Sequence, residues 1–506
     1  MRNRRSERRR EEAAANQRKK MVQPRSQLKT YDLLDEEKIE QIHDKSMQIL
    51  EEAGIAFYYD PALEILRKHG VKVDSDRVAY FDREMVKEYL AKAPSQFTWS
   101  ARNPENDVVI GGDYVCFAPV AGPPYVTDIV RGRRPSRHED LINFLKLTQM
   151  SPYLHTSGSE TVVSSDIPIE HRHLEVLYSH FTHSDKALMG IYHTGLTATD
   201  TLNMMRLVVG DRLDQQHYLH CIINVSSPRR LDDRMLSTLI AYASHNQIVN
   251  VTPFIFSGAM APVSVLGSVA QLNAETLAGI VFTQMVKAGT PCVYGSFPAI
   301  VDLQSGAPVM SAPESQLVLY ATAQLARHYK LPFRGAGNYA SSKLNDAQGA
   351  YESMMSFGPS MISQPNFILH AAGWLESGLT AGYEKFVLDL DILGMYHTLF
   401  KGIDWDEDQW AMDAILQVPP GGHHLGTDHT MRHFKTAFYR SSLFDYDAGE
   451  TWLANGGLDV SQRAQQKLSS LLNSYEKPYL AEDIKAALDD YLAMRKPQIT
   501  PSMIVG

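Results

Sequence analysis

The feature that most constrains the fold is a regular alternation of apolar strand candidates with helix-like segments beyond residue 130. Each strand candidate is a short apolar run, and the intervals carry apolar residues at helical spacing. The eight runs begin at Tyr153, Ala187, Tyr218, Ile248, Pro291, Leu331, Asn366 and Ala414. Eight strands alternating with helices predict an α/β fold of the (β/α)8 TIM-barrel type, with a parallel sheet made by right-handed crossovers.

Two doubly wound sheets are the alternative α/β architecture. Such sheets would place a glycine-rich phosphate loop near the first strand. The chain contains neither a GxGxxG nor a GxxxxGK[ST] stretch. The barrel is therefore the favoured fold.

The residues ahead of the barrel divide into two parts. Residues 1 to 26 hold ten Lys or Arg against three Glu, with no apolar segment of the kind that a secretory signal needs. We predict a basic, disordered tail over 1–29, solvated rather than bound to nucleic acid. Helix and hairpin patterns then predict an α+β cap over 30–130 and a barrel domain over 131–506.

Cysteine usage and hydropathy bear on the compartment. Cys116, Cys221 and Cys292 lie far apart in apolar runs, without CxxC spacing. This pattern indicates buried free thiols in a reducing compartment, which we take to be the cytoplasm. No run of about 18 apolar residues occurs, so the sequence predicts no membrane span.

Aromatic residues cluster just after the predicted strands. In a TIM barrel these positions meet at one mouth of the barrel. Taken singly, each ring is more often core filler, but several at strand ends together suit a cation that has no N–H donors. A ring face attracts such a cation by about 0.5 to 2 kcal/mol. The predicted mouth includes Tyr294, Phe297, Tyr339, His370 and Trp374.

Several longer stretches, taken in order, resemble one known family. These are SGAMAPVSVLGSVAQLNAETLAGIVFTQ, VYGSFPAIVDLQSGAPVMSAPE, RGAGNYASSKLNDAQGAYE and AAGWLESGLTAGYEKFVLDLDI. Their order and spacing resemble the trimethylamine methyltransferase family of corrinoid-dependent methyltransferases. Trimethylamine-specific members carry pyrrolysine in an AGS, pyrrolysine, SDAK turn, where this chain reads AGN-Tyr339-ASSK. The stretch PPGGHHLGTDHTMRHFKTAFYRSSLFDY is similar to the ending of members without pyrrolysine, which demethylate glycine betaine and related quaternary amines.

The resemblance implies transfer of a methyl group from a quaternary amine to the Co(I) of a separate corrinoid protein. A quaternary ammonium already has a neutral tertiary amine as its leaving group, so positioning and cation stabilisation suffice. The tyrosine at position 339 argues against trimethylamine as the substrate. The chain has no DxHxxG corrinoid segment, so we expect no tightly bound cofactor and a cognate corrinoid protein as partner. We further expect a homo-oligomer.

The resemblance also assigns roles to residues of this chain. Tyr339, Asn338 and Glu376 are expected to be catalytic. The strand-end positions add expected substrate contacts from Tyr294, Phe297, Trp374 and His370. His423 or His424 would contact the carboxylate of a betaine, unless both only hydrogen-bond within a closing loop.

Two other functions stay open at this point. His423, His424, His429 and His433 include an i, i+4 pair, and some barrel hydrolases hold zinc with such histidines. Against this, the first strand candidate has only His155 and no HxH, so we expect no bound metal. The other alternative is a non-catalytic protein that binds quaternary amines.

Overall fold

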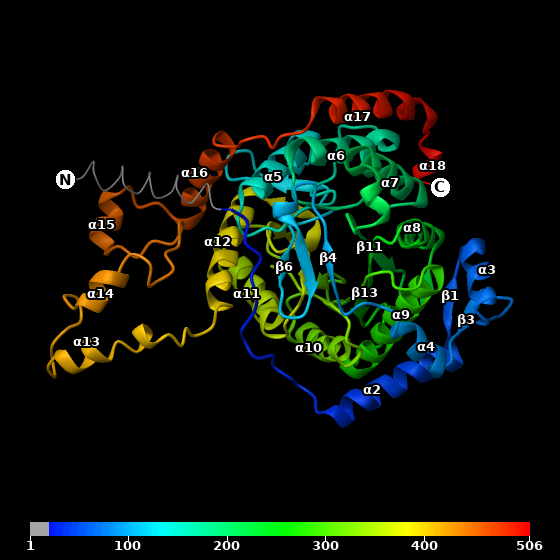
Figure 1. Cartoon of the computed structure of the whole chain (residues 1–506), viewed down its shortest axis with the longest axis horizontal. Helices are drawn as coiled ribbons and strands as arrows, with labels where there is room; N and C mark the ends of the chain where they lie inside the picture. Colours follow the sequence, from blue (N-terminus) through cyan, green and yellow to red (C-terminus); the bar gives the residue numbers. More distant parts are fainter. Residues whose placement is uncertain (1–19, 506) are drawn as a thin grey trace.

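The computed structural model describes residues 20–505, and its centre is a barrel of eight parallel strands (Figure 1). The eight strands form one sheet in which each of the seven neighbouring strand pairs is joined by hydrogen bonds. The remaining gap is closed where the His155 N–H donates to the Phe117 carbonyl over 2.9 Å. The TIM-barrel prediction is confirmed. The strands are β6 (Cys116–Phe117), β9 (Thr156–Gly158), β10 (Ala187–Met189), β11 (Leu219–Val225), β13 (Ile248–Ser257), β14 (Cys292–Gly295), β17 (Phe333–Gly335) and β18 (Phe367–Ile368).

One helix follows each barrel strand and covers the outside of the sheet (Figure 1). The strands are buried on both faces, which explains why they read as short continuous apolar runs. The helices are α5 (His138–Met150), α6 (Ile169–His183), α7 (Gly195–Val209), α8 (Asp233–Ser244), α9 (Val265–Val286), α10 (Pro313–His328), α11 (Ala347–Ile362) and α12 (Tyr383–Leu399).

The predicted strand at Ala414 is wrong. That segment forms the short helix α13 (Met412–Gln417), in which Ile415 and Leu416 are exposed. A short apolar run fits a buried strand or a helix equally well by periodicity. The strand that completes the barrel is β6, which lies ahead of the predicted domain boundary at residue 130. The division into domains otherwise stays a prediction.

The cap that precedes the barrel packs on α9, and two of its helices begin at side-chain caps. The carboxylate of Asp35 accepts from the Lys38 N–H at the start of α2 (Glu36–Gln48), and Asp82 accepts from Met85 at the start of α4 (Arg83–Leu90). The other cap elements are β1 (Ile55–Phe57), α3 (Asp60–Lys68), β2 (Lys72–Val73) and β3 (Val78–Tyr80). Strand β1 pairs with β3 and with β12 (Arg230–Leu231), which joins the cap to the barrel.

A hairpin of β4 (Gln96–Trp99) and β5 (Val108–Gly111) closes the amino-terminal end of the barrel. Trp99 is fully buried there against His220, with ring centroids 4.8 Å apart. Its indole N–H donates to the Tyr218 carbonyl over 3.2 Å. This end of the barrel is therefore filled by protein.

Residues 20–29 of the predicted tail make defined contacts. The Gln23 amide donates to the Val109 carbonyl over 2.7 Å, and Arg25 pairs with Asp113. The first nineteen residues of that predicted tail lie outside the described residues.

Two small sheets lie at the opposite, carboxyl-terminal end of the barrel. One contains β7 (Tyr125–Thr127), β8 (Arg134–Pro135), β19 (Trp374–Leu375) and β20 (Thr380–Gly382). The other is the hairpin of β15 (Phe297–Val301) and β16 (Pro308–Val309), which extends from β13.

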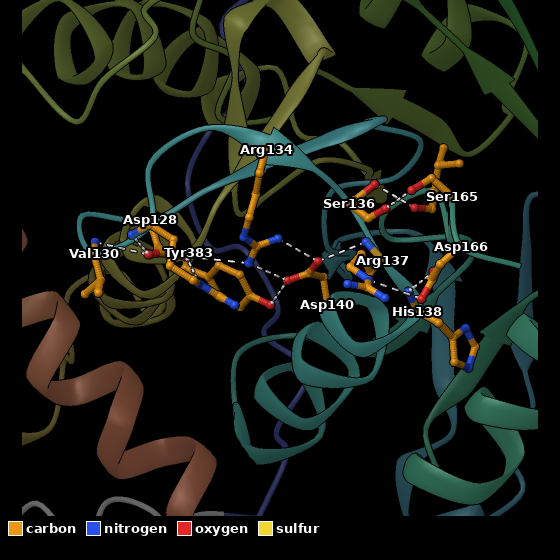
Figure 2. Close-up of polar contacts among 12 residues, drawn as sticks. Asp128, Val130, Arg134, Ser136, Arg137, His138, Asp140, Ser165, Asp166 and Tyr383 are labelled. Carbon is orange, nitrogen blue, oxygen red and sulfur yellow. Dashed lines mark hydrogen bonds and ion pairs between the residues drawn. The ribbon is translucent and has the colours of Figure 1, made fainter.

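A buried ion pair fixes the first of these sheets (Figure 2). Arg134 donates two hydrogen bonds of 2.8 Å to the Asp140 carboxylate, which also accepts from the Tyr383 hydroxyl. Although burial opposes it, these bonds lower the pKa of Asp140. A bidentate guanidinium pair gives direction as well as energy, so the β7–β8 hairpin is held firmly against α5 and α12.

The chain after α12 forms an arm over residues 401–459, which projects from the barrel in Figure 1. It carries α13, α14 (Asp428–His433) and α15 (Gly449–Ala454). The chain then returns through α16 (Val460–Asn473), which packs on α12, through α17 (Glu482–Arg495) on α7, and through α18 (Ser502–Val505).

Among the described residues, one helix is long and apolar enough to cross a membrane, namely α9. Nearly all of its side chains are buried between the barrel, the cap and α10. Its composition is therefore that of a core helix in a soluble protein.

Candidate functional site

Four rings meet at the carboxyl-terminal mouth of the barrel. The Tyr339 and Trp374 ring centroids lie 5.1 Å apart, and those of His370 and Trp374 lie 4.4 Å apart. Phe297 lies 5.3 Å from Tyr339 and 5.8 Å from His370. We call Phe297, Tyr339, His370 and Trp374 the aromatic group.

Glycines set the backbone that presents two of these rings. A Cβ at Gly337 would lie 2.4 Å from the His370 carbonyl, so only glycine lets the turn before Tyr339 approach the loop after β18. A Cβ at Gly378 would lie 2.5 Å from the Trp374 ring, and Gly378 has a φ of +94°. The indole therefore rests directly on the backbone of its own loop.

Arg334 lies beside the aromatic group, inside the barrel. It is the middle residue of β17, only 1% exposed, and its guanidinium carbon is 4.6 Å from the Phe297 ring centroid. Within residues 20–505, its guanidinium donates one hydrogen bond, a long one of 3.3 Å to the Ser296 carbonyl. Among the described residues it forms no ion pair with a carboxylate. A buried guanidinium without a counter-ion is costly, so this position is strained energetically unless a ligand completes it.

Further donors at this place also lack acceptors. The Tyr339 hydroxyl, the Trp374 indole N–H and the Arg334 Nε–H are buried and have no hydrogen-bond partner within residues 20–505. Burial raises the pKa of Tyr339, so its hydroxyl keeps its proton. Buried polar groups in native proteins are nearly always paired, and unpaired ones together mark a place for a ligand or water.

His370 adds another donor to the set. The Ala121 N–H donates to its Nδ1 over 3.2 Å, so the proton of the neutral ring is on Nε2. Burial, reinforced by the charge of Arg334, holds the pKa of His370 well below its usual range. The residue has a φ of +62°, which is uncommon for a side chain other than glycine and is typical of functional sites.

Two other predicted residues support the site from its edges. The Asn338 amide donates to the Ala371 carbonyl over 2.8 Å and so joins the loops after β17 and β18. Glu376 accepts from Arg133 over 2.8 Å at the rim, and also from Thr380. Although burial opposes it, the bonds from Arg133 and Thr380 lower the pKa of Glu376, so the carboxylate is charged and paired.

The structure does not bring Tyr294 into the aromatic group. Tyr294 points outward from β14 toward the helices, where its hydroxyl donates to Asn273 over 2.9 Å. Its ring stacks on Tyr329. The expected position at the mouth is therefore corrected: successive strand residues face opposite sides of the sheet, and Tyr294 occupies the outward side.

His423 and His424 also lie elsewhere. Both are exposed in the arm, ahead of α14, and neither contacts the barrel mouth of its own chain. The expected contact with a substrate carboxylate is corrected in the same way. Arg334 and His370, in contrast, lie at the mouth beside the aromatic group.

The histidine pair considered for zinc is on the arm as well. His429 and His433 lie on α14, and together with Asp408 they form the single group of three possible metal ligands found within residues 20–505. Asp408 is also paired with Arg432. The group is outside the barrel, whereas a barrel hydrolase would hold its metal at the mouth.

Arg334 is not among the site residues predicted from the sequence. A usable signal was present, because LPFRGAG places a charged residue inside a short apolar strand. A charge at such a position needs a partner, and no obvious partner appears in the same segment.

Comparison with known proteins identifies the relatives of this chain. The family described as "Trimethylamine methyltransferase (MTTB)" matches residues 1–500. A glycine betaine methyltransferase from Desulfitobacterium hafniense (strain Y51) is 40% identical, over 93% of this chain and 98% of the relative. A proline betaine:corrinoid methyltransferase from Eubacterium limosum is 27% identical, over 90% and 96% of the two chains.

Solved structures agree with the fold. The monomethylamine methyltransferase MtmB of Methanosarcina barkeri superposes with a TM-score of 0.51 at 10% sequence identity, covering 87% of this chain and 89% of that one. At this identity the likeness concerns the fold alone. The family match covers nearly the whole chain, and one relative is 40% identical. This protein is therefore a methyltransferase of the trimethylamine methyltransferase (MTTB) family.

Proposed function

We propose that this methyltransferase moves a methyl group from glycine betaine, or a related betaine, to the Co(I) of a corrinoid carried by a partner protein. The observation that carries the proposal is the buried Arg334 guanidinium, which lacks a carboxylate and lies against the aromatic group. A betaine has the two complementary parts, a carboxylate and a quaternary ammonium. The names of the two betaine-specific relatives support the same substrate class.

The carboxylate of the substrate fits the donors that have no acceptor. The Arg334 guanidinium would bind it by charge-assisted hydrogen bonds, joined by the Nε2–H of neutral His370. Such a contact also removes the cost of the uncompensated buried charge. Choline and tetramethylammonium lack a carboxylate and would leave Arg334 unpaired, so the site discriminates against them.

The quaternary ammonium fits the ring faces. The Phe297, Tyr339 and Trp374 ring centroids lie 5.1 to 6.1 Å from one another, and a ring face attracts a trimethylammonium group. The departing dimethylamino group is neutral, so no residue has to deliver a proton. The work of this chain is to hold one N–CH3 bond pointing out of the mouth and to exclude water.

The remaining predicted residues have positioning roles in this proposal. Asn338 ties the turn of Tyr339 to the loop of His370, and Glu376 with Arg133 holds the loop of Trp374. Neither side chain touches the place where the methyl group would lie. Of the three residues expected to be catalytic, Tyr339 alone contacts the substrate in this proposal.

The partner would approach the mouth. Exposed apolar side chains follow the barrel strands there, which is unusual for loops unless another protein covers them. They include Ile129, Val130, Val263, Leu266, Leu303 and Leu344. When bound, the corrinoid of the partner supplies the cobalt nucleophile. The proposal places the enzyme in the cytoplasm, as a homo-oligomer.

A methyl-donor panel tests the function. The protein is incubated with cob(I)alamin and with glycine betaine, proline betaine, carnitine, choline or trimethylamine, and methylcobalamin formation is followed spectroscopically. We expect transfer from at least one betaine and little from choline or trimethylamine. Trimethylamine as the best donor, or transfer from none of the amines, would contradict the proposal.

A rim variant tests the docking of the partner. Leu303→Asp should raise the KM for the cognate corrinoid protein, because a charge replaces an apolar contact. The rate with free cob(I)alamin should stay unchanged. Equal effects on both reactions would show that Leu303 acts on the site itself.

A further inference from the structure

The arm over residues 401–459 is unusually apolar on its outside. Twelve large apolar side chains between Ile403 and Leu453 are more than a third exposed. The six most exposed are Ile403, Trp405, Leu416, Leu425, Phe438 and Tyr446, each more than 70% accessible. Single exposed apolar residues are ordinary, but a set of this size on one segment marks an interaction surface.

The outer face of helix α11 has the same character. The exposed positions include Ala350, Tyr351, Met354, Met355 and Ile362, and none of the exposed positions on this helix is charged. The helix's one acidic residue, Glu352, turns away to accept from the backbone N–H groups of Ser341 and Ser342. An outer helix of a barrel normally turns polar residues to water, whereas these side chains of α11 are apolar and stay exposed among residues 20–505.

The area of the arm is enough for a stable interface. At roughly 100 Å² of exposed surface per side chain, the twelve residues present about 1,200 Å², against roughly 800 Å² per partner in an interface of standard size. A surface this apolar has to be covered permanently for the protein to stay in solution. A corrinoid partner must bind and leave in every cycle, and its place is the mouth, so it does not suit this role.

We propose that the arm of one chain packs on the α11 face of a second copy of this chain, and that the partner's arm does the same in return. Both patches belong to every chain, which is what a two-fold symmetric contact requires. Figure 1 shows the arm leaving the barrel on the side where α11 and α12 lie, clear of the cap. The proposal does not depend on the identity of the substrate.

Molar mass measured by light scattering tests the contact. We expect the wild-type chain to elute as a dimer or a multiple of it. The double variants Leu416→Asp with Phe438→Asp on the arm, and Tyr351→Glu with Met354→Glu on α11, should each shift it to a monomer at micromolar concentration. These side chains are exposed in the single chain, so circular dichroism should show an unchanged fold.

A control and a cross-linking experiment make the result specific. Tyr58→Asp, at an exposed apolar residue of the cap, should leave the dimer intact. In a mixture of isotope-labelled and unlabelled chains, an amine cross-linker should join Lys435 of the arm to Lys343, next to α11, between differently labelled chains. A monomeric wild-type protein, a dimer that survives both double variants, or an arm protected only when corrinoid protein is added would each overturn the proposal.

Discussion

Trp99 and Trp374 lie at opposite ends of the same barrel, each buried in a cluster of rings, yet their surroundings differ in one respect. Trp99 packs on His220 and gives its indole N–H to the Tyr218 carbonyl. Trp374 packs on His370, and its indole N–H has no acceptor within the described residues. Burial and aromatic composition are alike at the two ends, so they do not identify a ligand site.

The difference lies in the hydrogen bonds. At the amino-terminal end the β4–β5 hairpin fills the barrel with apolar side chains, and the Trp99 indole N–H is satisfied by protein, although both ring nitrogens of His220 beside it have no partner within the described residues. At the mouth, Arg334, Tyr339 and Trp374 present donors for which the chain offers no acceptor. Several buried donors left unpaired beside one another suit a ligand that brings the acceptor.

The largest effect that we expect is on stability, at the filled end. Trp99→Ala should lower the free energy of unfolding by about 3 to 5 kcal/mol, because it opens a cavity under the barrel. Urea titration followed by tyrosine fluorescence or circular dichroism measures this. The KM for betaine of the folded fraction should not change.

Phenylalanine variants at the two tryptophans sharpen the comparison. Trp99→Phe removes a hydrogen bond and should cost about 1 kcal/mol in addition to the packing lost. Trp374→Phe removes an N–H without a partner, so its cost in the ligand-free protein should be smaller. A larger loss at Trp374 than at Trp99 would contradict the distinction between a filled end and a binding end.

The next effect concerns Arg334. Arg334→Gln should lower kcat/KM for glycine betaine by on the order of a hundredfold, about 3 kcal/mol, because a buried charged hydrogen bond to the carboxylate is lost. Transfer from tetramethylammonium, however slow in the wild type, should be unchanged. A parallel loss with both donors would show that Arg334 only shapes the barrel.

A stability measurement separates the two explanations for Arg334. Arg334→Met has a similar volume and no charge, and it should leave the protein as stable as the wild type or more stable. Thermal unfolding without substrate measures this. A strongly destabilised Met variant would show that the guanidinium has a structural partner in this chain.

Much of the fold could be predicted from the sequence, because β10, β11 and β13 are apolar runs bounded by turn residues. The alternation of strands and helices was clear without knowing any contact. The strand β6, Cys116–Phe117, is too short to form a pattern, and its place in the barrel depends on pairing with β18. The run at Ala414 shows the reverse error, since an apolar stretch on an exposed arm has the composition of a buried strand.

The site could be predicted only in part. Phe297, Tyr339, His370 and Trp374 come after strands, so the fold alone places them at the mouth. Tyr294 is inside a strand that is buried on both faces, where composition does not tell which residues face the barrel. The expectation for His423 and His424 rested on resemblance, and the path of the arm relative to the barrel is a tertiary property. The lack of a counter-ion at Arg334 depends on which residues surround it in the folded protein, so it could not be predicted from the sequence.

Tyr339 gives a smaller expected effect. Tyr339→Ala should lower kcat/KM for the best betaine by about 1 to 3 kcal/mol, from one lost cation–π contact and looser positioning. Tyr339→Phe keeps the ring and should cost much less. Similar losses in both variants would show that the hydroxyl, which has no partner within residues 20–505, binds the substrate directly.

The last comparison concerns the histidines at the two ends and their effect on stability as the pH falls. Burial, reinforced by Arg334, lowers the pKa of His220 to about 3 and holds that of His370 well below its usual range. An unfolded histidine binds a proton near pH 6.5, whereas these two stay neutral in the folded protein. The unfolded chain therefore takes up more protons as the pH falls below 6.5, and folding stability drops by up to about 1.4 kcal/mol per pH unit for each histidine. His370→Gln and His220→Gln should each make the fall of Tm between pH 6.5 and 5 less steep.

Saturating betaine places a carboxylate beside His370, which favours the charged ring, so the ligand should reduce the contribution of His370 to the pH dependence of stability and leave that of His220 unchanged. A ligand effect that is the same in the two variants would show that the carboxylate does not lie at the mouth beside His370.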